Sequence, residues 1–234
     1  MSKNSYFNAQ GLCRIVDDIL VIKCPREHDA MPIIKKQGID LIDMQYVSFQ
    51  NTRQNDDRDA NKKTIGFFIQ DCKFECVRRK PWQYVERFLQ YKQVMSLDLS
   101  CFRDMPISEQ RLSVYQNRVI GAFWQHAGLT VIPSVTWGDD KSYGFTFSGI
   151  EEDSIVAVST IGTRANYELF MMGFIEMCRR INPQKVICYC HPYKEMYDYA
   201  NILHIEYAGR EPWRIARHRQ IPGQLSLFDY EEDA

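Results

Sequence analysis

Residues 94–137 constrain the fold more than any other part of the chain, because they have the pattern of a strand, a long helix and a second strand. Residues 94–100 are short and mostly apolar. Residues 106–126 carry apolar side chains three and four positions apart, which is the spacing of one helix face. Residues 130–135 are apolar again. Two strands joined by a helix in this order predict a parallel pair with a right-handed crossover.

The ends of the predicted helix carry residues that are typical of helix boundaries. Asp104 can cap the first turn, Pro106 fits the start because no backbone donor is lost there, and Gly128 suits the end. The helix is therefore expected to begin near Pro106 and to end before Gly128.

The rest of the chain largely repeats this unit. Strands are predicted at residues 19–22, 44–47, 65–69, 154–158, 185–189 and 204–207, and helices at residues 81–92, 166–181 and 193–202. Strands that recur about every 20–35 residues indicate βα units. We predict an α/β fold: a small or distorted (βα) barrel-like parallel sheet with an irregular N-terminal section. An open doubly wound sheet is the alternative.

The sequence divides into four sections. Residues 1–63 form the irregular N-terminal section, whose polar segment 50–63 is expected to be a solvated, mobile loop. Residues 64–209 form the βα core. Residues 210–223 form a basic linker, and residues 224–234 form an exposed tail.

Composition and charge limit the kinds of partner. The 234-residue chain has a formal net charge of −1, so no global attraction draws it to nucleic acid or to a membrane. Because residues 1–10 are polar, no signal peptide is expected, and no apolar run comes near the ~18 residues of a membrane span. Its eight cysteines are therefore expected to be reduced thiols of a cytoplasmic protein.

Cysteine spacing and the common catalytic motifs give little support to known chemistries. The three-residue gap between Cys72 and Cys76 is admissible for zinc and the one-residue gap between Cys188 and Cys190 is poor, so ordinary core or surface thiols are favoured over a metal site. The sequence has no Walker loop, no dinucleotide-binding Gly-x-Gly-x-x-Gly and no nucleophile elbow. These absences exclude the easily recognised NTPases, dinucleotide-binding enzymes and hydrolases.

Polar side chains follow several of the predicted strands. Asp71 follows residues 65–69, Asp98 and Ser100 end residues 94–100, and His191 follows residues 185–189. Both candidate architectures place the active site at the carboxyl ends of the strands. These side chains could therefore converge to bind a divalent cation or to perform acid–base chemistry. The alternative is that they cap helices and turns.

Basic residues lie at two further places. Arg118 and its neighbour Asn117 fall within the predicted long helix, where an exposed helix face is the favoured interpretation. A basic stretch follows the core: Arg210, Arg214, Arg217 and Arg219. In a helix the first three of these would share a face on which DNA phosphates could bind. A solvated terminal helix is the alternative.

Several strings of the core, taken together, are similar to one known family. They are Phe68-Ile-Gln-Asp71, Leu97-Asp-Leu-Ser100, Tyr115-Gln-Asn-Arg118, Val131-Ile-Pro133 with Trp137, and Val158-Ser-Thr-Ile-Gly162. They resemble the uncharacterised DUF4417 family of bacteria, phages and mobile elements, with departures at Leu99 and Gln116. The resemblance implies the βα fold and a mobile-element context without an activity. It makes the following residues candidates for a shared site: Asp71, Asp98, Ser100, Arg118 and Trp137.

The tail contains a second resemblance. Residues Gln224, Leu225, Ser226, Leu227 and Phe228 resemble, at all five positions, the pentapeptide by which bacterial polymerases and repair proteins bind the sliding clamp. Such a motif binds in an extended form and needs a flexible segment. The resemblance implies that Leu227 and Phe228 anchor the tail and that Gln224 forms orienting hydrogen bonds. The alternative is that the apolar residues pack back on the domain as a terminal strap.

Three functions stay open at this point. The first is a DNA replication or repair factor of a phage or mobile element, recruited to the bacterial DNA polymerase sliding clamp. The second is a metal-dependent small-molecule or nucleic-acid enzyme that works at the strand ends. The third is a non-catalytic protein that occupies the clamp and modulates host replication. A cleft lined by Asp71 and Asp98 would favour catalysis, and a filled rim would favour a binding module.

Overall fold

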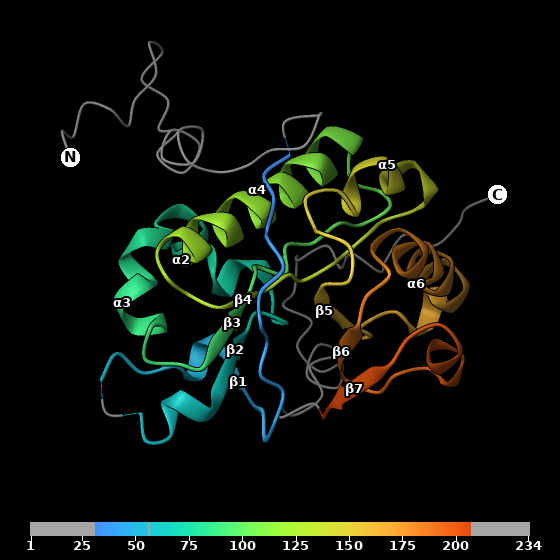
Figure 1. The fold of residues 1–234 in the computed structure, drawn as a ribbon. Helices are drawn as coiled ribbons and strands as arrows, with labels where there is room; N and C mark the ends of the chain where they lie inside the picture. The colour runs from blue at the N-terminus through green and yellow to red at the C-terminus, as the bar shows by residue number, and fades with distance from the viewer. Residues whose placement is uncertain (1–30, 56, 207–234) are drawn as a thin grey trace, which may run out of the picture.

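The computed structural model describes residues 31–55 and 57–206, and its strands are all parallel (Figure 1). One sheet has the strand order β1-β2-β3-β4, and the other has the order β5-β6-β7. The strands are β1 (Gln45–Ser48), β2 (Lys63–Gly66), β3 (Gln93–Met95), β4 (Val131–Ile132), β5 (Ile155–Ser159), β6 (Lys185–Tyr189) and β7 (Ile202–Ile205). The predicted α/β class and the parallel pair around the long helix are confirmed.

A short junction joins the two sheets. Ser134, just after β4, bridges in parallel to Ala157 of β5. The N–H of Val135 donates to the Ala157 carbonyl, and the N–H of Ala157 donates to the Pro133 carbonyl, both at 2.9 Å. The described strands therefore follow one another in chain order, without the reversal that defines a doubly wound sheet.

The strands curve around a shared apolar interior. The Tyr46 ring on β1 lies 4.6 Å from the Tyr189 ring on β6, although these strands are far apart in the order. The Phe68 ring, just after β2, stacks on the same Tyr189 ring at 5.2 Å. Side chains of the other strands fill the interior around them: Met95, Ile132, Ala157 and Ile187. This arrangement is the barrel-like geometry that the sequence predicts.

Helices cover the outer faces of the sheets (Figure 1). The long helix α4 (Ile107–His126) packs on the first sheet, where Trp124 is fully buried, and α6 (Tyr167–Ile181) packs on the second. Gly128, just after the end of α4, has a φ of 96°, and the helix ends before it, as predicted. The predicted Asp104 cap is wrong, because Pro106 is the N-cap residue and no side chain caps the helix.

The remaining helices are short. They are α2 (Glu75–Arg79), α3 (Val85–Phe88) and α5 (Tyr143–Thr146), and the 3₁₀ turns η2 (Phe49–Asn51), η3 (Ala60–Lys62), η4 (Asp71–Lys73), η5 (Pro81–Tyr84), η6 (Asp140–Ser142), η7 (Arg164–Asn166) and η8 (Lys194–Asp198). The single helix predicted at residues 81–92 is therefore η5 followed by one turn of α3. The helix predicted at residues 193–202 is the 3₁₀ turn η8. Within the described part of the chain no helix is long and apolar enough to span a membrane.

The polar segment before β2 is attached to the core through Tyr91. The Tyr91 hydroxyl donates to Asp57 Oδ2 at 2.6 Å and accepts from the N–H of Arg53 at 2.9 Å. Asp57 also pairs with Lys63 at the start of β2. These contacts place part of residues 50–63 against the body of the protein.

Arg118 and Asn117 are buried in the centre of the fold, so the interpretation of an exposed helix face is wrong. Their exposed fractions are 1% and 2%. Arg118 Nε donates to the Ser148 carbonyl at 2.9 Å, and its terminal nitrogens donate to the Thr146 carbonyl at 2.7 Å and the Ser134 carbonyl at 3.2 Å. One charged side chain thus satisfies backbone acceptors on either side of the sheet junction.

Replacing Arg118 should destabilise the protein strongly. Arg118→Leu removes the Arg118 donors to the Thr146 and Ser148 carbonyls and one of the two side-chain donors to the Ser134 carbonyl, and we expect it to lower the free energy of unfolding by about 3 kcal/mol or more. Arg103→Leu changes an exposed arginine and should stay within about 0.5 kcal/mol of the wild type. Urea unfolding followed by circular dichroism measures both. Equal free energies of unfolding for the two variants would contradict the stabilising role of the buried Arg118 side chain.

Candidate functional site

The structure brings Asp71 and Ser100 together at the carboxyl ends of β2 and β3. Asp71 Oδ1 accepts a hydrogen bond from the Ser100 hydroxyl at 3.0 Å, and Asp71 Oδ2 accepts from the Ser100 N–H at 3.0 Å. Burial raises the pKa of Asp71, although these donors and the charge of Arg78 act against the rise. Asp71 therefore does not cap its own turn, and instead joins two neighbouring strand ends.

Asp98 lies close enough to Asp71 for the two carboxyl groups to interact. Burial, and then the charge of Asp71, raise the pKa of Asp98 to about 8. Among the described residues no group donates a hydrogen bond to the Asp98 carboxyl. Asp71 accepts two hydrogen bonds and Asp98 accepts none. Asp71 is therefore the carboxyl group of the pair that ionises first as the pH rises. At neutral pH the pair then consists of a carboxylate and a carboxylic acid.

Tyr46 adds a hydroxyl to this region. The Tyr46 Oη is buried, with the Phe68 backbone and the Tyr189 side chain beside it. Burial, and then the neighbouring Tyr189 and Asp98, raise the pKa of Tyr46 well above its usual value. Its ring lies over Gly66, where a Cβ would be only 2.1 Å from Tyr46 Cε2. Sequence reasoning missed Tyr46; the glycine in the neighbouring strand β2 was the signal that another group approaches closely.

Arg78 lies beside the pair and balances part of its charge. Arg78 Nε donates to Glu75 Oε2 at 2.6 Å, and another of its nitrogens donates to Gln116 Oε1 at 3.0 Å. The positive charge of Arg78 also lowers the pKa of Asp71. Glu75 and Gln116 therefore hold a fixed cation near the more easily ionised carboxyl group.

His191 does not join this group. Its ring lies 5.4 Å from the His204 ring, and its carbonyl accepts from the Thr160 hydroxyl at 2.9 Å. No contact in the described chain links His191 to Asp71 or Asp98. The expected convergence of Asp71, Asp98 and Ser100 is therefore seen, while His191 lies with β7 and the end of β5.

Arg118 and Trp137 are placed as structural residues. The Arg118 guanidinium binds the backbone carbonyls around the sheet junction. The Trp137 ring lies 5.2 Å from Phe170 and so close to Gly173 that a Cβ there would be 2.1 Å from Trp137 Nε1. These side chains pack between helices and strands.

A divalent cation at this site would compete with a proton for the Asp98 carboxyl. A divalent cation prefers ionised carboxylates, whereas Asp98 keeps its proton to about pH 8. In residues 31–55 and 57–206, no three His, Cys, Asp or Glu side chains are grouped as metal ligands. Cys72 and Cys76 are exposed, and Cys188 and Cys190 are buried. A cation at Asp71 would have to displace the Asp98 proton.

Three expectations lie outside the described residues. They are the predicted strand at residues 19–22, the basic stretch that contains Arg210, Arg214, Arg217 and Arg219, and the pentapeptide from Gln224 to Phe228.

The fold and the site define a parallel α/β protein with a carboxyl pair at its strand ends. The sequence profile described as "Domain of unknown function (DUF4417)" matches residues 28–208. The chain therefore belongs to the DUF4417 family, and the resemblance found in the sequence is confirmed.

Phage proteins are among its relatives. The chain is 31% identical to "Gene 1 protein" of Mycobacterium phage L5 over 153 residues. This aligned region covers 64% of this chain and 67% of that protein. It is 33% identical to "Gene 1 protein" of Mycobacterium phage D29 over 128 residues. This aligned region covers 53% of this chain and 47% of that protein. No solved structure matches the chain. The family thus includes phage-encoded members.

The raised pKa of Asp98 predicts a pH dependence of stability. Between about pH 4 and pH 8 the folded protein keeps the Asp98 proton and the unfolded chain releases it. The stabilisation from this proton is therefore complete at low pH and is lost as the pH rises through about 8. Relative to wild type, Asp98→Asn should gain at least about 2 kcal/mol between pH 5 and pH 8.5, after allowance for solvent screening of the partly buried carboxyl.

Urea unfolding at each pH measures this difference. Asp104→Asn, which changes an exposed aspartate, serves as the control and should follow the wild type. A difference between Asp98→Asn and wild type that does not vary with pH would show that Asp98 titrates normally.

Proposed function

We propose that the protein is a DNA replication or repair factor, recruited to the bacterial DNA polymerase sliding clamp by residues 224–228. The pentapeptide from Gln224 to Phe228 carries this proposal, because it resembles the clamp-binding motif at all five positions. Pro222 and Gly223 precede it, and acidic residues follow it, which suits a segment that must enter a groove in extended form. Phage relatives agree with the phage or mobile-element origin that this proposal assumes.

The residues of the pentapeptide divide the work of binding. Leu227 and Phe228 fill an apolar pocket, Leu225 adds packing, and the Gln224 amide forms the orienting hydrogen bonds. The arginines of the basic stretch, which stands between the core and the tail, would add contacts to DNA phosphates beside the clamp.

A tail peptide tests the recruitment. A peptide of residues 223–234 should bind purified clamp with a Kd in the micromolar range or tighter. In the full chain, Leu227→Ala with Phe228→Ala should abolish clamp binding and leave the melting temperature unchanged. Ser226→Ala, within the same segment, is the matched control and should reduce binding by less than about threefold. A double variant that still binds clamp, or that unfolds the domain, would refute recruitment through this segment.

A second candidate function is acid–base catalysis at the strand ends. The coupled pair of Asp71 and Asp98 favours it, because one carboxyl group is arranged to accept a proton and the other to donate one near neutral pH. The reaction class is a proton-coupled bond cleavage on a nucleic acid or small molecule, with or without a divalent cation. The Tyr46 hydroxyl lies in the same region and can donate a hydrogen bond to a reacting oxygen.

Activity assays on DNA test this candidate. With Mg²⁺ or Mn²⁺ present, we expect turnover that falls about 100-fold or more in Asp98→Asn and Asp71→Asn. Asp104→Asn should keep wild-type activity, because Asp104 is exposed and lies outside the pair. Equal activity of all these proteins would remove the pair from catalysis. Clamp binding without any turnover would instead identify a non-catalytic modulator of host replication.

A further inference from the structure

Arg78 on α2 is a fixed cation beside the carboxyl pair, and only part of its hydrogen-bonding capacity is used. Its Nε donates to Glu75 Oε2 at 2.6 Å, and one terminal nitrogen donates to Glu75 Oε1 at 2.5 Å. The other terminal nitrogen donates to Gln116 Oε1 on α4 at 3.0 Å. These contacts use three of the five N–H donors of a guanidinium group. Among the described residues no further acceptor is bonded to it, so two donors are left for a ligand.

The Arg78 guanidinium lies within electrostatic reach of Asp71 and can be approached from solvent. The hydrogen bond and charge of Glu75, and then the charge of Asp71, raise the pKa of Arg78. The carboxyl group of Asp71 accepts its two hydrogen bonds from Ser100 and leaves the Arg78 donors free. The Arg78 side chain is 31% exposed. An anion that binds Arg78 would therefore lie beside the carboxyl pair.

The segment that contains Asp71 and Arg78 has more cations than acids. Residues 71–80 contain four basic and two acidic side chains: Lys73, Arg78, Arg79, Lys80, Asp71 and Glu75. Lys73 and Lys80 are exposed and form no salt bridge with a described residue. Arg79 pairs with Glu75 and is still 73% exposed. This surplus of positive charge attracts an anion to the strand ends.

A phosphate ester fits these groups. The parallel N–H donors of an arginine match two oxygens of a phosphate group, and a guanidinium that is already held in place loses little freedom on binding. Asp98 keeps its proton to about pH 8, so at neutral pH it adds no negative charge that would repel the ligand. Its carboxylic acid can also donate a hydrogen bond to a phosphate oxygen.

We propose that Arg78 binds a phosphate group of the substrate beside Asp71 and Asp98, and that Glu75 and Gln116 position Arg78 for this contact. The ligand is a phosphate ester, supplied by a single-stranded nucleic acid or by a mononucleotide. The proposal rests on the second candidate function, acid–base catalysis at the strand ends, and it names the substrate class of that site.

Titration calorimetry of the full chain tests the contact, with three ligands at pH 7 and about 50 mM salt. They are a short oligothymidylate strand, thymidine 5′-monophosphate and thymidine. We expect at least one phosphate ligand to bind and thymidine not to bind. If the strand alone binds, its Kd should fall in about the 1–100 micromolar range, and the ligand is a nucleic acid. If the monophosphate also binds, a mononucleotide is sufficient.

Substitutions near Arg78 should change the affinity in opposite directions. Arg78→Gln should weaken phosphate binding at least about tenfold and should lower the salt slope of strand binding by about 0.7. Asp71→Asn should strengthen binding about threefold or more, because it removes a negative charge beside the phosphate. Gln116→Leu removes only a positioning contact and should weaken binding about threefold without a change in melting temperature.

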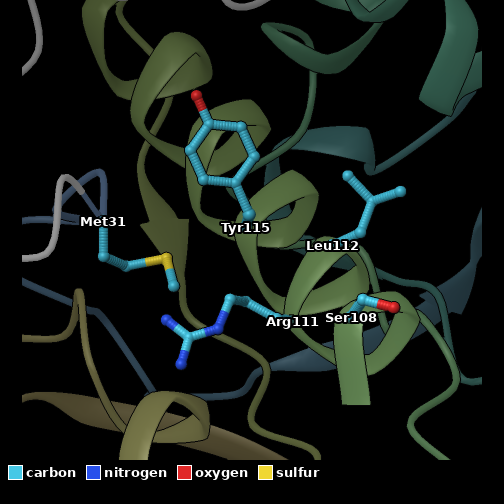
Figure 2. Close-up of a pocket in the computed structure, with 5 residues that line it drawn as sticks. All are labelled: Met31, Ser108, Arg111, Leu112 and Tyr115. Carbon is cyan, nitrogen blue, oxygen red and sulfur yellow. The ribbon is translucent and has the colours of Figure 1, made fainter. Parts of the chain in front are cut away.

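Arg111 supplies the matched control, because it is an exposed arginine on α4 outside residues 71–80. Figure 2 shows it with the other residues that line a surface hollow beside this helix: Met31, Ser108, Leu112 and Tyr115. The hollow shares no residue with the carboxyl pair or with residues 71–80. Arg111→Gln should therefore keep the wild-type affinity for phosphate ligands to within about twofold.

Three results would overturn the proposal. The first is equal affinity of wild type, Arg78→Gln and Arg111→Gln for the phosphate ligands. The second is no binding of either phosphate ligand. The third is strand binding that survives Arg78→Gln and is lost when the arginines of the basic stretch are changed to alanine. Should Arg78→Gln fail to fold, Asp71→Asn with unchanged or weaker binding would overturn the proposal in its place.

Turnover assays separate this proposal from the function on which it rests. Phosphate binding that depends on Arg78, without turnover of any phosphate ligand, would refute catalysis and leave the binding site standing. Turnover that requires Asp98 and is unchanged in Arg78→Gln would support catalysis and refute the role of Arg78.

Discussion

The buried polar network around Arg118 and Asn117 is the interaction on which the rest of the fold depends. Asn117 Oδ1 accepts from the Ser96 hydroxyl at 3.0 Å and from Arg118 at 2.6 Å, so that α4 is tied to β3. Ser96 and Ser134 exchange hydrogen bonds at 2.8 Å, which ties β3 to the end of β4. Buried polar groups are costly unless each has a partner, and here the partners lie on several elements. The network therefore defines where the first sheet ends and the second begins.

This junction also determines what lies at the strand ends. With α4 held against β3, the segment that leaves β3 directs Asp98 and Ser100 toward the end of β2, where Asp71 accepts both Ser100 donors. The chemical difference between Asp71 and Asp98 follows from this unequal supply of donors and from burial. The fold thus separates a carboxylate from a carboxylic acid at the edge of an apolar interior.

The repeating strand–helix pattern was enough to predict the parallel α/β fold, the long helix α4 and the convergence of Asp71, Asp98 and Ser100. Those features depend on local periodicity and on the rule that parallel strands end at one edge. Burial of Arg118 could not be predicted, because its partners are backbone carbonyls whose positions only the tertiary fold supplies. Tyr46 was missed for the same reason: its neighbour Tyr189 is far away in sequence, and only Gly66 indicated a close approach.

A carboxyl-carbon NMR titration of Asp98 tests the central claim, that the strand ends hold an unequal, interacting carboxyl pair. In wild-type protein the Asp98 resonance should titrate with a midpoint near pH 8, and Asp71→Asn should move that midpoint to lower pH by removing the neighbouring charge. A midpoint near pH 4 in the wild type, or one that Asp71→Asn leaves unchanged, would contradict the account.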